Sequence, residues 1–421
     1  MPSSNFLTVE SSPTPDKTLR WQYAAVKIIT WLLRILAGSL FIFSGFVKAI
    51  DPWGTIFKIE DYLAAFGLPL PFILMRLAVF ALCAVEFTVG CFLALGCFRK
   101  SCPVFAGLIM VVMLPLSLWI AMENPVADCG CFGDAVVISN WATFWKNVAL
   151  SAAIVWLLRF NISVGCLISP AFQWLAVVAS GIFIVVIELV GYFYQPLIDF
   201  RDYPTGSTLF ATEENTEDTT ENTTAQNPEE GEDGVGNYRG IDVFDIDTGD
   251  DMTSQALVPD GKELVVMIPK ISMVSPATTW KLNSLYEWAE DNDVKMIGVV
   301  SGSRIEIEQW EDLSMADYPL YLADDSAIKE VVRGNPGIVY LDNGKIVWKS
   351  TLSAIDVDDF LSPEVSGDAS TFAGDNARFL RNCAGAYLIV MAFLVLISFT
   401  PRLTHLLTRS GLASHRGVRH H

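Results

Sequence analysis

Two cysteines near position 130 are the residues of this 421-residue sequence best suited to chemistry. Cys129 and Cys131 are separated by a single glycine in the segment Asp128-Cys-Gly-Cys-Phe-Gly133. A disulfide between thiols at this spacing closes a small strained ring, and strained disulfides are more oxidising and more easily exchanged than relaxed ones. The spacing therefore favours thiol–disulfide exchange, with Cys129 and Cys131 as a candidate catalytic redox pair.

Three other roles for these cysteines compete with redox exchange. Both can be unpaired structural thiols, or one of them can form a structural disulfide with Cys383. The third role is half of a metal site, but the segments expected nearby supply no histidine and no second cysteine pair. Carboxylates such as Asp128 and Asp134 would complete a zinc shell poorly, so we predict no metal site.

A second group of candidate residues is ionisable and lies inside long apolar segments. Charged groups in hydrocarbon are unfavourable and are often functional. Arg34 and Glu86 are expected at a similar depth, so they could meet as a buried ion pair or form a proton or quinone site. Lys48, Arg76 and Lys146 are expected near the outer ends of their segments, where long side chains can reach the interface. Arg34, Glu86 and Lys48 form the candidate intramembrane polar site.

The composition excludes a soluble enzyme and disfavours a nucleic-acid partner. Hydrophobic residues make up 52% of the chain, charged residues make up 18%, and the mean hydropathy is +0.40. The net charge is −19, whereas binding phosphates requires a basic face. Residues 213–251 hold fourteen of the acidic residues and one arginine. We interpret residues 196–260 as an acidic, largely disordered linker.

Six apolar segments are long enough to cross a membrane as helices, which predicts the lipid bilayer as a partner. The segments are Ile28–Ile50, Phe72–Leu95, Pro103–Met122, Trp141–Phe160, Phe172–Tyr194 and Ala384–Thr400. Basic residues in the tails and short connections fall on one side of these segments. Because basic residues mark the cytoplasmic side, we expect a multi-pass protein of the bacterial inner membrane with cytoplasmic tails at 1–27 and 401–421. The region between the fifth segment (170–195) and the sixth is then extracytoplasmic.

The chain after the acidic linker alternates strand and helix signals, which is typical of an α/β domain at 261–362. A second linker is expected at 363–383. The predicted strands and helices of the domain are a strand at 264–268, a helix at 276–292, a strand at 294–300, a helix at 305–313, a strand at 320–322, a helix at 327–333, a hairpin at 337–348 and a helix at 355–361. The hairpin is turned by Asp342-Asn-Gly344, a strong turn signal.

Several motifs occur together between residues 28 and 160. Arg34 is followed by Gly-Ser-Leu-Phe-Ile-Phe-Ser-Gly45, Lys48, Asp51-Pro52, Glu86 and then Cys-Gly-Cys-Phe-Gly. This order resembles the DoxX-like membrane proteins, and the cysteine element is similar to their methylamine-utilisation branch, MauE. The resemblance implies a four-helix membrane domain linked to amine metabolism, to thiol or quinone redox chemistry, or to disulfide formation in exported proteins, with a quinone as a candidate cofactor.

The order of strands and helices in 261–362 resembles the thioredoxin-like fold. Pro336 matches the position where that fold keeps a cis proline, and Ser272 and Ser275 stand where redox-active members carry Cys-x-x-Cys. No cysteine occurs between Cys166 and Cys383, so this domain cannot itself exchange disulfides. Ser272, Ser275 and Pro336 are expected to line a surface that binds a peptide of a partner, unless the domain is a structural cap on the bundle.

The sequence therefore predicts an α-helical polytopic membrane bundle of six transmembrane helices with an extracytoplasmic α/β thioredoxin-like domain. Its expected function is that of an accessory in thiol–disulfide or quinone-linked redox chemistry, or in the maturation of envelope proteins. An extracytoplasmic protein client is the expected partner. The alternative is a non-enzymatic membrane scaffold whose thioredoxin-like domain binds an envelope partner, and whether the protein is an enzyme stays open.

Overall fold

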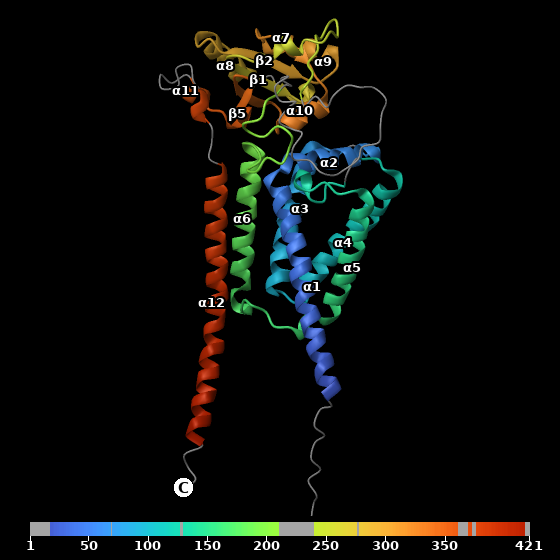
Figure 1. Cartoon of the computed structure of the whole chain (residues 1–421), viewed down its shortest axis with the longest axis vertical. Coiled ribbons are helices and arrows are strands. Elements are labelled where there is room, and N and C mark those ends of the chain that lie inside the picture. Colours follow the sequence, from blue (N-terminus) through green and yellow to red (C-terminus); the bar gives the residue numbers. More distant parts are fainter. Residues whose placement is uncertain are drawn as a thin grey trace, which may run out of the picture.

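A computed structural model describes residues 17–68, 70–126, 129–209, 240–275, 278–360, 369–372 and 376–416. The helices stand side by side in a bundle, and the α/β domain lies at one end of it (Figure 1). The start of α1 and the end of α12 lie at the other end (Figure 1). Asp128, the centre of the predicted acidic linker, part of the predicted second linker and the outer parts of both predicted tails fall outside the described residues.

Six of the described helices contain segments that are long and apolar enough to cross a membrane, which confirms the six predicted segments. These helices are α1 (Lys17–Ile50), α3 (Phe72–Leu95), α4 (Ser101–Glu123), α5 (Asn140–Phe160), α6 (Gln173–Phe193) and α12 (Asn376–Arg416). The first and the last of these helices are longer than predicted, since α1 begins before Ile28 and α12 begins before Ala384. The helix α12 packs beside α6, where the hydroxyls of Ser180 and Tyr387 are 2.9 Å apart.

Close packing of α1 against α3 sets the register of the bundle. A Cβ atom built on Gly45 would lie 2.5 Å from the nitrogen of Phe87, and one built on Gly90 would lie 2.4 Å from the nitrogen of Ile42. Only glycine allows the two backbones to approach this closely, as is common between membrane helices. The two antiparallel helices therefore place Gly45 opposite Phe87, and this pairing decides which ionisable residues meet.

The connection between the first two membrane segments, where no helix was expected, contains α2 (Pro52–Ala65), and this corrects the sequence interpretation. The side chain of Asp51 accepts a hydrogen bond from the backbone nitrogen of Gly54 at 2.9 Å, and Pro52 occupies the first turn. Both features favour a helix start. At 14 residues α2 is too short to span a membrane, so a search for long apolar segments overlooks it. It lies across the end of the bundle, beneath the α/β domain (Figure 1).

The α/β domain contains the predicted strands and helices in the predicted order. They are β1 (Lys262–Ile268), α8 (Thr279–Asp291), β2 (Lys295–Val300), α9 (Arg304–Ser314), β3 (Leu320–Leu322), α10 (Asp325–Val331), β4 (Gly337–Asp342), β5 (Lys345–Thr351) and α11 (Val357–Phe360). The sheet order is β3-β2-β1-β4-β5, with β1 parallel to β2 and antiparallel to β4. The Asn335–Pro336 peptide bond, directly before β4, is cis, as expected. The domain thus has thioredoxin-like topology.

The central strand β1 is buried on both faces, so it contributes to two hydrophobic cores. Leu264, Val266 and Ile268 point into one core, while Val265 and Met267 point into the other. The sequence of such a strand is a continuous apolar run, because alternate side chains point to opposite faces of the sheet and both faces are buried.

Part of the predicted acidic linker belongs to this domain, which corrects its boundaries. Leu209, Ile241 and Val243 are fully buried in the second core. Thr208 pairs with Lys345, and Phe244 pairs with Leu322. Residues 196–209 and 240–260 therefore belong to the folded α/β domain. Their few apolar side chains pack against the sheet, although many of the residues between them are acidic.

Candidate functional site

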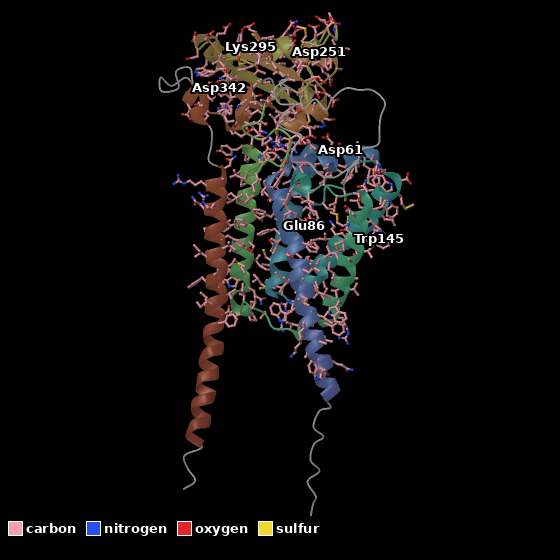
Figure 2. The ribbon with its side chains drawn as sticks, in the orientation of Figure 1. Asp61, Glu86, Trp145, Asp251, Lys295 and Asp342 are labelled. Atoms are coloured by element: carbon pink, nitrogen blue, oxygen red, sulfur yellow. The ribbon has the colours of Figure 1, made fainter. Side chains whose placement is uncertain are left out.

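A buried ion pair joins the first two membrane helices of the bundle. Lys48 Nζ on α1 lies 2.9 Å from Glu86 Oε2 and 3.0 Å from Glu86 Oε1 on α3, and both side chains are at most 5% exposed. Figure 2 marks Glu86 inside the bundle. Ser44, one helical turn before Lys48, places its hydroxyl 2.8 Å from Glu86 Oε2 and 3.1 Å from Lys48 Nζ. Each charge is thus paired and further hydrogen-bonded, as burial in a bundle requires.

The expected meeting of Arg34 with Glu86 is wrong, because Glu86 pairs with Lys48 instead. Arg34 donates from Nε to the carbonyl of Leu93 at 3.3 Å and from Nη1 to the carbonyl of Gly165 at 3.0 Å. Fourteen residues separate Arg34 from Lys48, or about 21 Å along a helix. Since Gly45 faces Phe87, Glu86 lies opposite the C-terminal end of α1, where Lys48 is. Arg34 lies farther back along α1 and connects it to the carbonyls of Leu93 and Gly165.

The two cysteines lie directly above this ion pair, in the segment between α4 and α5. Cys129 Sγ and Cys131 Sγ are 3.3 Å apart. Gly130 and Gly133 adopt positive φ angles of 60° and 53°, a backbone conformation that glycine favours. Cys383, the alternative disulfide partner, lies on α12, where it packs against the bundle core.

Two hydroxyls hold the cysteine segment against the bundle. The phenol of Tyr62 on α2 donates to the carbonyl of Cys129 at 2.5 Å, and Ser44 Oγ lies 2.9 Å from the carbonyl oxygen of Cys131. Ser44 therefore joins the cysteine segment to the Lys48–Glu86 pair. The sequence interpretation missed both Ser44 and Tyr62. The position of Ser44 one turn before Lys48 was the signal that could have revealed it, since residues four apart share a helix face.

The surroundings of the two thiols push their acidities apart. The hydrogen bond from Cys129, together with the positive charges of Lys146 and Lys48, lowers the pKa of Cys131 to about 6 despite its burial. The same hydrogen bond and burial raise the pKa of Cys129 well above its usual range. Cys131 lines a small pocket with Lys48, Glu86 and Lys146. Cys131 is thus the thiolate of the pair, and Cys129 keeps its proton.

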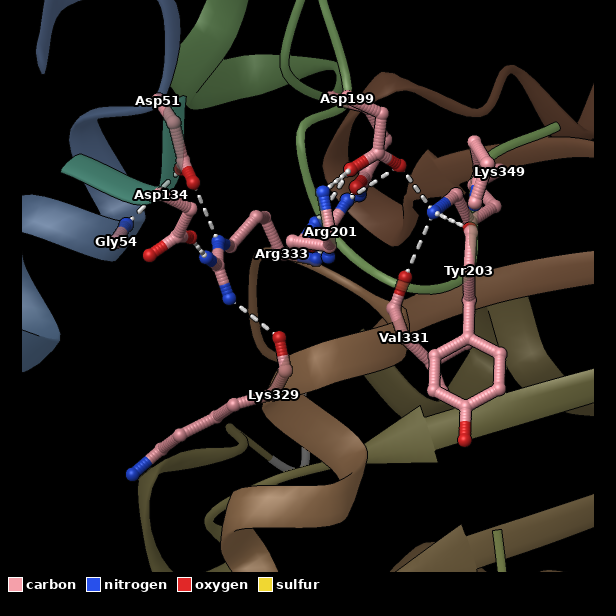
Figure 3. Close-up of polar contacts among 12 residues, drawn as sticks. Asp51, Gly54, Asp134, Asp199, Arg201, Tyr203, Lys329, Val331, Arg333 and Lys349 are labelled. Carbon is pink, nitrogen blue, oxygen red and sulfur yellow. Dashed lines mark hydrogen bonds and ion pairs between the residues drawn. The ribbon is translucent and has the colours of Figure 1, made fainter. Parts of the chain in front are cut away.

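An arginine of the α/β domain reaches this segment. Arg333 Nε lies 2.8 Å from Asp51 Oδ2 and its Nη2 lies 2.5 Å from Asp134 Oδ2 (Figure 3). The side chain of Gln195 bonds both the carbonyl of Arg333, at 2.7 Å, and its backbone nitrogen, at 3.1 Å. Asp134 follows Cys131 by three residues, so Arg333 links the domain to the cysteine segment. Sequence reasoning placed Arg333 only at the end of a predicted helix and had no signal for its partners.

A second ion-pair cluster lies beside Arg333 (Figure 3). Asp199 accepts from Arg201 Nε at 2.7 Å and from Arg201 Nη2 at 2.9 Å, and it also pairs with Lys349 of β5. Lys349 Nζ further donates to the carbonyl of Val331 at 2.9 Å. This cluster fastens the chain that leaves α6 to the sheet.

Two of the three predicted residues of the thioredoxin-like site, Ser275 and Pro336, lie at the face that meets the bundle. Ser272 is exposed on a short turn, Ser275 is exposed two residues after that turn, and Pro336 is buried. Ser275 and Pro336 line a pocket of about 410 Å³ whose opposite wall is formed by α2, α3 and α6. The expected peptide-binding surface therefore faces the membrane bundle. Within the described ranges, no cluster of three or more histidine, cysteine, aspartate or glutamate side chains is placed to hold a metal ion.

The fold and the site define a multi-pass membrane protein with a cysteine-bearing helical bundle and a thioredoxin-like domain. Residues 26–160 match the family described as "Methylamine utilisation protein MauE", so this part of the chain is a MauE-family segment. The match covers the resemblance expected for residues 28–160.

Two solved structures from Xanthomonas campestris are similar to part of the chain. A bacterioferritin comigratory protein, described for its alkyl peroxide reduction activity, is 14% identical, with 35% of this chain and 92% of that chain covered and a TM-score of 0.22. A cysteine-to-serine mutant of peroxiredoxin Q is 13% identical, with 37% and 91% covered and a TM-score of 0.22. A search of curated protein sequences returned no match.

Proposed function

We propose that this protein is a membrane thiol–disulfide redox accessory in which Cys129 and Cys131 oxidise a dithiol client. The observation that carries the proposal is the 3.3 Å separation of the two sulfurs beside Lys48 and Lys146. A low thiol pKa stabilises the reduced pair relative to its disulfide, and this makes the disulfide a stronger oxidant. Pairing with Glu86 holds the ammonium group of Lys48 in place, and Ser44 bonds the carbonyl of Cys131, so the positive charge stays beside Cys131.

In the proposed reaction a client thiolate attacks Sγ of Cys131, the more exposed of the two cysteine residues. A mixed disulfide forms, and the Cys129 sulfur leaves and takes up a proton. The second client thiolate then attacks the client sulfur and releases Cys131 as a thiolate. The client gains a disulfide, and two electrons pass to the cysteine pair. A membrane quinone, the candidate acceptor, would restore the disulfide by taking two electrons and two protons.

We further propose an inner-membrane orientation with both termini cytoplasmic and the α/β domain outside. The basic residues in the first part of α1, between α3 and α4, in the last turn of α5 and at the end of the chain support this orientation. Disulfide exchange also favours it, because the cysteine segment would then lie on the oxidising side of the membrane. The description of the matched family makes a protein of methylamine utilisation one candidate client.

The proposal is tested with the full-length protein in nanodiscs. The oxidised protein is incubated with a reduced dithiol peptide, and alkylation followed by mass spectrometry measures peptide oxidation and the state of Cys129 and Cys131. We expect stoichiometric peptide oxidation by the wild type and by Cys383→Ser, and none by a Cys129→Ser/Cys131→Ser double variant. Equal oxidation by the double variant would show that the pair is not the redox centre.

A non-enzymatic scaffold is the second candidate function. It is favoured by the absence of cysteine from the α/β domain and by the contact of its Ser275 and Pro336 face with the bundle. In a strain that lacks the protein, a scaffold predicts full complementation by the double cysteine variant, whereas the redox proposal predicts none.

A further inference from the structure

The pocket between the α/β domain and the bundle has features that the proposed redox chemistry does not use. Its volume of about 410 Å³ is in the range of small-molecule sites. The bundle contributes aromatic side chains from three helices, among them Trp53, Phe72 and Tyr192, and the domain contributes Lys270 and Lys281. The pocket thus combines an aromatic wall with a basic rim.

The aromatic wall is packed and held by hydrogen bonding. The rings of Trp53 and Tyr192 stack with centroids 4.9 Å apart and planes 5° apart, and the ring of Phe72 stacks with that of Trp53 at a centroid distance of 5.9 Å. Trp53 Nε1 donates to the carbonyl of Tyr192 at 2.9 Å. Aromatic residues at the ends of membrane helices typically lie at the level of the lipid headgroups.

The charged residues that line the pocket are three cations and one anion. Glu60, the anion, pairs with Lys270, and Lys281 Nζ donates to the carbonyl of Ile355 at 2.8 Å. Arg76 Nη1 donates to the hydroxyl of Tyr192 at 3.2 Å. Among the described residues, Arg76 makes no ion pair with a carboxylate. The pocket therefore has an excess of positive charge, and the guanidinium of Arg76 can bind an anion there.

The surface next to Arg76 is apolar and open. Ile73 and Leu77 share the face of α3 that carries Arg76, and they are 47% and 58% exposed. An apolar chain that leaves the pocket at Arg76 can therefore continue along α3 on the side that faces lipid. A ligand suited to both parts has an anionic head and a hydrocarbon body.

We propose that this pocket binds the headgroup of an anionic phospholipid. Arg76 binds the phosphate, the wall formed by Trp53, Phe72 and Tyr192 packs against the glycerol backbone, and the acyl chains lie along Ile73 and Leu77. The lipid fills the space between the bundle and the domain face that carries Ser275 and Pro336. This inference does not depend on the cysteine chemistry.

Native mass spectrometry of the full-length protein, released from detergent after incubation with defined lipids, tests the proposal. We expect phosphatidylglycerol to stay bound to the wild type and phosphatidylcholine to be lost. Arg76→Gln should reduce retention of phosphatidylglycerol about tenfold, the effect of one charge-assisted contact. Lys100→Gln, which removes a positive charge at the other end of the bundle, is the matched control and should retain it.

A second measurement covers the outcome in which Arg76→Gln folds poorly. Phosphatidylglycerol should raise the thermal midpoint of the wild type and of Arg76→Lys, while glycerol phosphate, which shares the headgroup but has no acyl chains, should not. Equal effects of the two anions would indicate a site for a soluble phosphate and would overturn the lipid assignment. Equal retention of phosphatidylglycerol by the wild type and by a folded Arg76→Gln variant would overturn the role of Arg76.

Discussion

Arg333 of the thioredoxin-like domain and Asp134 of the cysteine segment form an ion pair across 199 residues of sequence, with Nη2 2.5 Å from Oδ2. The same guanidinium binds Asp51, which caps α2, so one buried side chain joins the domain, α2 and the segment that carries Cys131. Any movement of the domain relative to the bundle must break these contacts. Domain docking and the position of the cysteines are therefore physically coupled.

Loss of the Arg333 side chain should destabilise the protein and loosen the domain. Arg333→Met leaves two carboxylates without their partner, and we expect the free energy of unfolding to fall by about 3 kcal/mol, at the low end for a broken buried ion pair because Asp134 keeps some solvent access. Thermal unfolding in detergent measures the loss. Arg304→Met is the matched control, because its pairs with Glu308 and Asp247 are exposed and the midpoint should hardly change. If the thermal midpoint of Arg333→Met equalled that of the control, the stabilising role of the Arg333 contacts would be contradicted.

The reactivity of Cys131 should follow its lowered pKa. The thiolate, which is the reactive form, predominates above the pKa of about 6, so alkylation of the reduced protein by iodoacetamide should rise through pH 6 and level off near pH 7. At pH 5 the rate should be about tenfold below the plateau, since one pH unit below the pKa leaves about a tenth as thiolate. Mass spectrometry should locate the adduct on Cys131. Labelling that rises only above pH 8 would contradict the lowered pKa.

The two members of the buried ion pair should shift this pKa in opposite directions. The charge of Lys48 lowers the pKa of Cys131 and the charge of Glu86 raises it. Lys48→Met should therefore move the alkylation profile to higher pH, and Glu86→Gln should move it to lower pH. The pH profile of alkylation distinguishes these effects from a general loss of folding, which would expose both cysteines. Shifts of the same sign would disprove the electrostatic role assigned to the pair.

Replacement of either cysteine should separate their roles. Cys129→Ser leaves the accessible Cys131 with no neighbour to resolve it, so a mixed disulfide with a client thiol should accumulate. Cys131→Ser should give several-fold less of this adduct, because the remaining Cys129 is buried. Non-reducing gels after treatment with a disulfide-activated peptide quantify the adducts. The reverse ranking would assign the exchange step to Cys129.

The proposed orientation predicts which parts of the chain are reached from outside. A Thr248→Cys variant places an accessible thiol on the exposed surface of the α/β domain. In intact spheroplasts a membrane-impermeant maleimide should label this thiol, and lysis should add little. Lys100→Cys, at the opposite end of the bundle, should react only after lysis. Labelling of Lys100→Cys in intact spheroplasts and of Thr248→Cys only after lysis would invert the topology.

Much of the fold could be predicted because local patterns are enough to produce it. The long apolar runs become helices wherever they lie, since a bilayer leaves few other ways to satisfy the backbone. The strand and helix order of the α/β domain followed from alternating apolar runs and from the Asn343–Gly344 turn. Short helices outside the long apolar segments lack such a signal, and α2 was therefore not predicted.

The candidate site was only partly predictable. Cys129, Cys131, Lys48 and Glu86 were identified by residue type, but Arg34 was the partner expected for Glu86. Depth estimated from segment ends cannot replace helix register, which the contact between Gly45 and Phe87 decides. Ion pairs depend on atoms within a few ångströms, so no local pattern indicates them.

The sequence by itself determined which segments enter the membrane, where the cysteines lie and that the thioredoxin-like domain lacks them. These properties belong to single residues or to short runs. Only the tertiary structure decided that Lys48 neutralises Glu86 beneath Cys131, that Arg333 reaches Asp134, and that the face with Ser275 and Pro336 meets the bundle. Each of these contacts joins segments far apart in the chain, and their energies fall off too steeply with distance to be read without the packing that brings the segments together.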